Sequence, residues 1–166
     1  MKNDRKLPRL KEYDYSSNGK YFVTFCVKDM KCVLSMIVGS GDPDAPQVRL
    51  SKEGKIVENN ITEMNKRYSE IKIEKYVIMP NHIHLIVSVE KTDSCGASGS
   101  PLPTNSLVSR HIGTLKRFCN KQIGGNIWQT GFYDHIIRDD DDYIYHLQYI
   151  DENPRKWLIG KDKYYS

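Results

Sequence analysis

Two histidines separated by one residue, His82 and His84, are the clearest candidates for chemistry in this sequence. They follow Pro80 and Asn81, which are turn formers, and β-rich runs flank that turn, so the stretch YVIMPNHIHLIVSV predicts a β-hairpin. Because side chains alternate between the faces of a strand, both imidazoles point the same way. The pair could hold one metal ion, although it does not name the ion and needs a third ligand. Ordinary core or surface histidines are the alternative.

A second candidate group lies near the C-terminus, where Tyr149 and Asn153 are four residues apart in a predicted helix. This spacing places both on one helical face, away from the apolar stripe that contains Tyr143. If the helix packs beside the hairpin, the tyrosine is a candidate nucleophile, because a divalent ion polarises a phosphate and stabilises the developing charge. Tyr143 and Tyr145 compete for this role, and a half-buried aromatic without a catalytic role is the alternative reading of Tyr149.

The elements that must position these groups are predicted from hydrophobic periodicity. β-branched and aromatic runs predict strands at residues 21–27, 71–79, 82–89 and 132–137, and apolar spacing predicts one helix after Ser51 and another over 107–123. A strand over 31–38 and an extended piece over 47–50 have weaker signals. With the strand over 31–38 set aside, the order is βαββαβ plus a C-terminal helix that carries the tyrosine. We therefore expect an α+β, ferredoxin-like sandwich with an antiparallel sheet.

The last helix begins in a run of four aspartates, Asp139 to Asp142, which suits a helix N-terminus. These acids could also bind a cation, but capping is the better explanation. The helix should run to about Glu152 and stop near Pro154. Three further histidines are expected to be structural or solvated: His111, His135 and His146.

Length and composition indicate a single domain over residues 1–166, with a basic arm over 1–20 and a flexible Gly/Ser/Pro-rich loop over 92–105. No apolar run approaches a membrane span and the N-terminus is polar, so no membrane partner and a cytoplasmic location are expected. The four cysteines form no C-x-x-C pair, which favours free thiols over a zinc knuckle.

The net charge is only +4, but basic residues gather in two segments. Residues 1–20 carry six Lys/Arg against three Asp/Glu, and residues 107–123 carry four basic residues and no acid. An anionic partner such as DNA fits this distribution, although solvated faces explain it equally well. The candidate phosphate contacts are Arg5, Lys6, Arg9 and Lys11 in the arm, and Arg110, Arg117 and Lys121 in the helix.

Three pieces in this order, PNHIHLIV, WQTGFYDHIIR and YIDENP, resemble the REP-associated tyrosine transposases, a branch of the single-tyrosine HUH transposases. The resemblance covers roughly residues 13–157. It implies metal-dependent cleavage and joining of single-stranded DNA beside hairpins. His82, His84 and Asn153 would bind Mg²⁺ or Mn²⁺, and Tyr149 would form a 5′-phosphotyrosine link that frees a 3′-OH.

Two other functions are weighed against this one. The first is a hairpin-DNA-binding protein without cleavage activity, and the second is a small metal-binding protein without nucleic acid. The basic segments argue against the second. The sequence does not name the DNA target, does not distinguish a monomer from a homodimer, and does not separate a mobile-element role from a host role.

Overall fold

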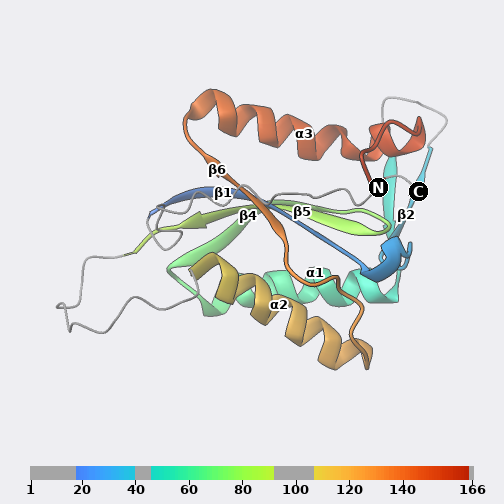
Figure 1. Ribbon diagram of the computed structural model, residues 1–166, viewed down its shortest axis with the longest axis horizontal. Coiled ribbons are helices and arrows are strands. Elements are labelled where there is room, and N and C mark those ends of the chain that lie inside the picture. Colours follow the sequence, from blue (N-terminus) through green and yellow to red (C-terminus); the bar gives the residue numbers. More distant parts are fainter. Residues whose placement is uncertain (1–17, 40–45, 92–106, 165–166) are drawn as a thin grey trace, which may run out of the picture.

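The computed structural model of the chain describes residues 18–39, 46–91 and 107–164 (Figure 1). Residues 1–17 of the predicted basic arm and the whole predicted loop over 92–105 lie outside this part. Arg5, Lys6, Arg9 and Lys11 are therefore outside the described residues.

Four strands form the central sheet, in the order β4-β5-β1-β6. They are β1 (Gly19–Cys26), β4 (Ile71–Ile78), β5 (His82–Val89) and β6 (Tyr133–Ile137). Every neighbouring pair is antiparallel. The first and third strands of the βαββαβ unit occupy the middle, which is the ferredoxin-like arrangement, so the predicted fold class is confirmed.

Helices cover both faces of this sheet (Figure 1). α1 (Lys52–Arg67) and α2 (Leu107–Ile123) lie on one face, and α3 (Asp140–Leu158) lies on the other. The N-caps are those that the sequence indicates, because the side chain of Ser51 accepts from the amide of Gly54 and that of Asp139 from the amide of Asp142. Gly54 is required at its place, since a Cβ there would lie 2.0 Å from the carbonyl oxygen of Leu34.

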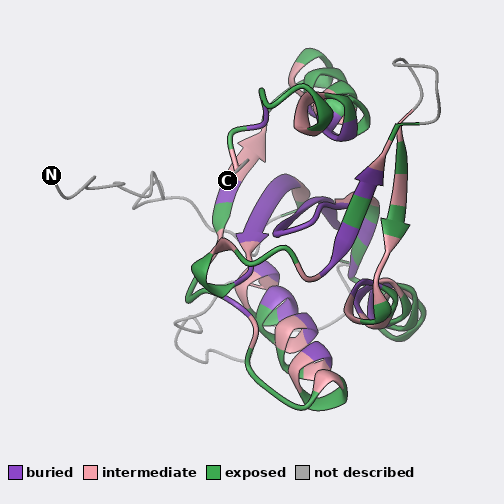
Figure 2. Cartoon of the chain, turned by 90° about the vertical axis from the view of Figure 1, so that its right-hand side faces the viewer, coloured by how far each residue is buried: buried purple, intermediate pink, exposed green. Residues whose placement is uncertain are grey.

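The central strand β5 is buried along its whole length because helices cover it from both sides. Alternate residues of β1 and β5, including Val23 and Leu85, join the larger core toward α1 and α2. The other set packs a smaller core under α3, with Phe22, Ile86 and Ile150 at its centre. Figure 2 shows the buried residues gathered in the sheet and on the helix faces turned toward it.

Two features differ from the sequence-based expectation. The weakly predicted strand over 31–38 exists but begins only at Ser35, as β2 (Ser35–Val38). It pairs with the predicted extended piece, β3 (Gln47–Leu50), in a separate two-stranded sheet and not in the central one. The expected end of the last helix near Pro154 is wrong, because α3 continues to Leu158. Asn153 and Pro154 are both buried there, so packing against the sheet outweighs the cost of a proline inside the helix. Among the described residues no helix combines the length and apolarity of a membrane crossing.

Candidate active site

His82 and His84 lie on the face of β5 that α3 covers. Both are essentially buried, with exposed fractions of 0% and 1%. Their Nε2 atoms lie 3.1 Å apart. Two ligands of one metal ion stand about 3 Å apart when each bond is about 2.1 Å and the bonds are perpendicular, so this separation suits a shared ion.

The outer nitrogen of each imidazole has a fixed partner. Nδ1 of His82 donates to the Asn81 side-chain oxygen at 2.8 Å, which leaves its Nε2 lone pair directed into the site. Nδ1 of His84 lies 2.6 Å from the Thr24 hydroxyl, which can accept the proton there and free Nε2 of that ring as well. Such partners fix the tautomer and orientation of metal-binding histidines.

Both imidazoles are neutral near pH 7. Burial lowers the pKa of His82 to about 3 and lowers the pKa of His84 well below its ordinary value. A neutral imidazole is the form that binds a metal. The pair is thus in a ligating state without any proton having to leave.

α3 brings Tyr149 and Asn153 to the histidines. The Tyr149 ring meets the His84 ring edge-on, with 5.2 Å between centroids, and it also contacts Phe22. Burial raises the pKa of the half-buried Tyr149 phenol, an effect that the Asn153 side chain opposes. Asn153 is fully buried, and its side chain raises the pKa of His82, against the larger effect of burial. Its Oδ1 has no hydrogen bond of ordinary geometry in the described part of the chain.

The segment after α3 adds a carboxylate that sequence reasoning missed. Asp162 is buried, and its Oδ2 lies 4.0 Å from Nε2 of His82 with no hydrogen-bond partner among the described residues. Its Oδ1 accepts from the amide of Tyr164, whose ring lies 4.4 Å from the His82 ring. Asp162 follows the part of the chain that the sequence motifs cover, so no pattern singled it out.

A cavity of about 310 Å³ opens beside Tyr149 and His84. Tyr133 and Tyr145 contribute to its wall, as do His146 and Lys163. Aromatic rings of this kind can stack on unpaired bases. The cavity thus places aromatic rings and one lysine beside the candidate nucleophile.

The two competing tyrosines have other surroundings. The Tyr143 hydroxyl donates to a carboxylate oxygen of Glu74 at 3.0 Å, away from the histidines. Tyr145 is 61% exposed and lies beside the Tyr149 ring, in the wall of the cavity. Of the three tyrosines, Tyr149 is the one in contact with His84.

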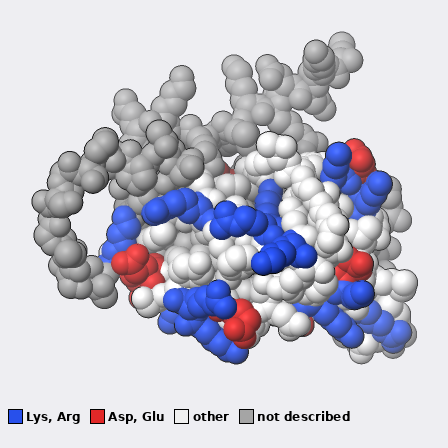
Figure 3. Space-filling model, turned by 90° about the horizontal axis from the view of Figure 1, so that it is seen from below, with Lys and Arg blue, Asp and Glu red and all other residues white. Residues whose placement is uncertain are grey.

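The predicted DNA-binding residues of α2 are not part of this group. Arg110, Arg117 and Lys121 are exposed on the outer face of α2, on the side of the sheet opposite α3. Figure 3 shows Lys and Arg side chains gathered over that lower face. Cations nearer to the tyrosine are Lys156, whose Nζ lies 4.9 Å from the centroid of the Tyr149 ring, and Lys163 in the cavity wall.

Comparison with known proteins finds no matching family model but several relatives. An uncharacterized protein of Haemophilus influenzae is 29% identical over 168 residues, covering 92% of this chain and 89% of the relative. The REP-associated tyrosine transposase of Escherichia coli is 32% identical over 91 residues, 55% of this chain and 48% of that protein. This match thus spans about half of the E. coli relative.

Among solved structures, a REP-associated tyrosine transposase bound to a REP hairpin superposes with a TM-score of 0.64. The match covers 93% of this chain and 76% of the other, at 22% sequence identity. At that level of identity the match establishes that the two chains share a fold.

Proposed function

We propose that this chain, which is related to the REP-associated tyrosine transposases, cuts and rejoins single-stranded DNA beside hairpins, with Tyr149 as the nucleophile. The observation that carries the proposal is a convergence of two elements. β5 supplies two neutral histidines whose Nε2 atoms lie 3.1 Å apart, and α3 brings Tyr149 and Asn153 against them. A protein that only binds hairpins has no need of this arrangement.

The residues present fit a divalent ion. His82 and His84 would hold it through Nε2, and Asn153 through the side-chain oxygen that has no hydrogen bond among the described residues. The Asp162 carboxylate lies within reach as a further oxygen ligand. Mg²⁺ or Mn²⁺ is the ion that the family resemblance implies, and the two nitrogen ligands favour Mn²⁺ of these. When bound, the ion would neutralise charge on the scissile phosphate.

The residues of the chain divide the chemistry between them. Oη of Tyr149 attacks the phosphorus while the bond from phosphorus to the 3′ oxygen breaks. The phenol proton is lost, the departing 3′ oxygen gains a proton, and the 5′ phosphate remains on the tyrosine. One phosphodiester replaces another, so the reverse reaction rejoins strands at the same site. Burial raises the pKa of the Tyr149 phenol, and the side chain of Asn153 lowers it, so Asn153 favours the phenolate against the effect of burial.

Hairpin binding would use surfaces on both sides of the sheet. The cavity beside Tyr149 would take the unpaired nucleotides at the cleavage site. Arg110, Arg117 and Lys121 on α2 would contact duplex phosphates, together with the arm residues Arg5, Lys6, Arg9 and Lys11. A hairpin that reaches both surfaces has to extend around an edge of the sheet, because α2 and α3 lie on opposite faces (Figure 1).

A cleavage assay tests the proposal. Single-stranded DNA carrying hairpins is incubated with the protein and Mn²⁺ or Mg²⁺, and the products are separated under denaturing conditions. We expect a covalent protein–DNA adduct that needs the metal, is lost in Tyr149→Phe and persists in the matched control Tyr145→Phe. Salt-dependent binding without any adduct across a broad set of hairpins would support the binding-only function instead.

A further inference from the structure

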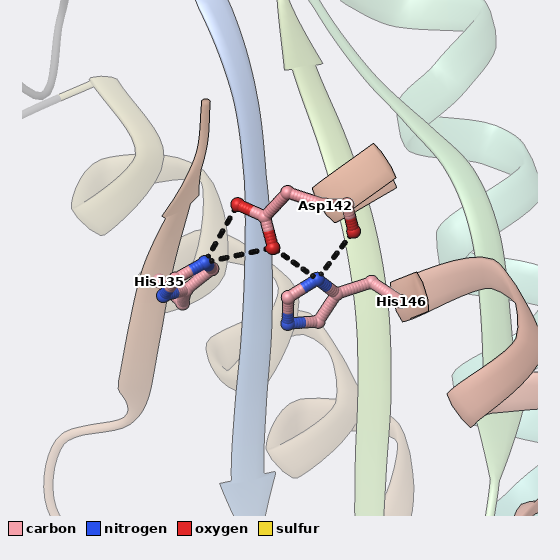
Figure 4. A group of neighbouring side chains, drawn as sticks. All are labelled: His135, Asp142 and His146. Atoms are coloured by element: carbon pink, nitrogen blue, oxygen red, sulfur yellow. Dashed lines mark hydrogen bonds and ion pairs between the residues drawn. The ribbon is translucent and has the colours of Figure 1, made fainter. Parts of the chain in front are cut away.

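A second group of metal-ligating side chains lies where β6 meets the start of α3 (Figure 4). His135 comes from β6, and Asp142 and His146 come from the first turns of α3. Nε2 of His135 lies 2.9 and 3.2 Å from the two Asp142 carboxylate oxygens. Nδ1 of His146 donates to the backbone carbonyl oxygen of Asp142 at 2.8 Å and lies 3.1 Å from one carboxylate oxygen. Figure 4 shows both imidazoles turned toward the carboxylate from opposite sides.

We propose that His135, Asp142 and His146 form a binding site for a transition-metal ion of the Zn²⁺ class, separate from the site at His82 and His84. One ligand atom from each residue lies within 4.8 Å of the other two. Ligands of a tetrahedral zinc ion stand about 3.3 Å apart at bond lengths of about 2.0–2.1 Å. The spacings of 2.9 Å and 3.1 Å are close to that value, and an ion would replace the hydrogen bonds that now join the carboxylate to the imidazoles.

Capping accounts for only part of the surroundings of Asp142. Asp139 is the N-cap, and its side chain accepts a hydrogen bond from the backbone amide of Asp142. The N-cap position is therefore already filled by another aspartate of the run. The Asp142 carboxylate instead faces the two imidazoles and the amide of Arg138. Asp142 and His146 are four residues apart on one helical face, and His135 approaches that face from the neighbouring strand.

The donor set selects the kind of ion. Two imidazole nitrogens and one carboxylate oxygen suit Zn²⁺ and similar ions, whereas Mg²⁺ prefers oxygen ligands alone. The side chains of His135, Asp142 and His146 are 32%, 21% and 10% exposed, so an ion can enter and water can occupy its remaining position. The Phe22 ring lies between this group and the first histidine pair, in contact with both His84 and His146.

The position of the site gives it a consequence for the helix that carries the tyrosine. An ion there would join β6 to α3 only three residues before Tyr149. It would therefore hold the first half of α3 against the sheet and stabilise the folded chain, since it binds the folded state alone. This role is independent of whether Tyr149 cleaves DNA.

Metal binding is measured in a background that lacks two competing groups of ligands. His82→Ala/His84→Ala eliminates the first pair, and Cys32→Ser eliminates an exposed thiol. Zn²⁺ is titrated by calorimetry and Co²⁺ by visible absorption, with thermal unfolding followed in parallel. We expect one bound ion, a Co²⁺ spectrum without thiolate bands, and a higher Tm on Zn²⁺ addition.

Variants of the cluster decide the assignment. Asp142→Asn keeps the shape of the side chain and should weaken Zn²⁺ binding at least tenfold and abolish the rise in Tm. The matched control Asp141→Asn, in the same exposed run, should change neither. If Asp142→Asn fails to fold, the partly exposed His135→Gln takes its place. A folded background protein that binds neither ion, or unchanged affinity in the cluster variant, would overturn the proposal and leave a hydrogen-bonded network.

Discussion

The hydroxyl of Thr24 on β1 lies 2.6 Å from Nδ1 of His84 on β5, directly across the pair of strands. If this hydroxyl orients His84 for metal binding, Thr24→Val should lower the affinity for Mn²⁺ by about 10- to 100-fold. Thr24→Ser keeps the hydroxyl and should retain most of the affinity. Calorimetric titration of the three proteins checks this, and equal affinities for Thr24→Val and wild type would show that the contact is only structural.

Asp162 provides a second test of the first metal site. Its buried Oδ2 lies 4.0 Å from Nε2 of His82 without a hydrogen-bond partner among the described residues. Asp162→Asn removes the charge and keeps the shape, so we expect several-fold weaker Mn²⁺ binding in the same titration. The control is Asp151→Asn, an exposed acid on α3 paired with Lys75. A loss of the same size in both variants would point to a general effect of charge and not to a ligand.

The basic residues on the exposed face of α2 should determine how strongly hairpin binding depends on salt concentration. Replacing Arg110, Arg117 and Lys121 together by alanine should weaken hairpin binding, because these residues would neutralise phosphates and release counterions. The slope of log K against log salt concentration should fall by about 2 to 3. Binding measured by fluorescence anisotropy at several salt concentrations gives this slope. An unchanged slope would place the hairpin elsewhere, for example beside Lys156 and Lys163 on the α3 side.

His111 should make the fold sensitive to acid. It is buried on α2 beside Tyr68, and burial lowers its pKa to about 4 from the ordinary 6.5. Because the folded-state pKa is the lower one, the unfolded chain binds more protons between these values, and stability falls as the pH drops from 6.5 toward 4. The shift corresponds to roughly 3 kcal/mol. His111→Phe should flatten this part of the curve of unfolding free energy against pH, and identical curves would contradict the assignment.

Much of the fold follows from local patterns. The run from Tyr21 to Val27 and the hairpin around Pro80 have strong β signals, and the helices have clear apolar stripes and caps, so their order already indicated a ferredoxin-like sheet. The prediction at Pro154 was wrong because the local effect of proline is to end a helix. Here Asn153 and Pro154 are buried within α3, against the sheet, and the helix continues to Leu158. Burial of that kind depends on which elements pack together, and local sequence preferences carry no information about that packing.

The candidate site divides in the same way. Strand geometry predicts that His82 and His84 share a face, and helix geometry predicts the same for Tyr149 and Asn153. The structure brings the two pairs together. Their chemical roles stay predictions. Thr24 and Asp162 reach the histidines only through strand pairing and the chain reversal after α3. The group of His135, Asp142 and His146 likewise needs β6 beside α3, so the sequence suggested separate structural or solvated histidines instead.

The most direct measurement of the central claim is to identify the residue that becomes attached to DNA. The adduct formed on a hairpin substrate with Mn²⁺ is digested with nuclease and protease, and the nucleotide-bearing peptide is sequenced by mass spectrometry. The proposed function predicts a 5′-phosphate on Tyr149, within a peptide that also contains Tyr143 and Tyr145. Attachment at either of those tyrosines, or at a residue outside α3, would contradict it.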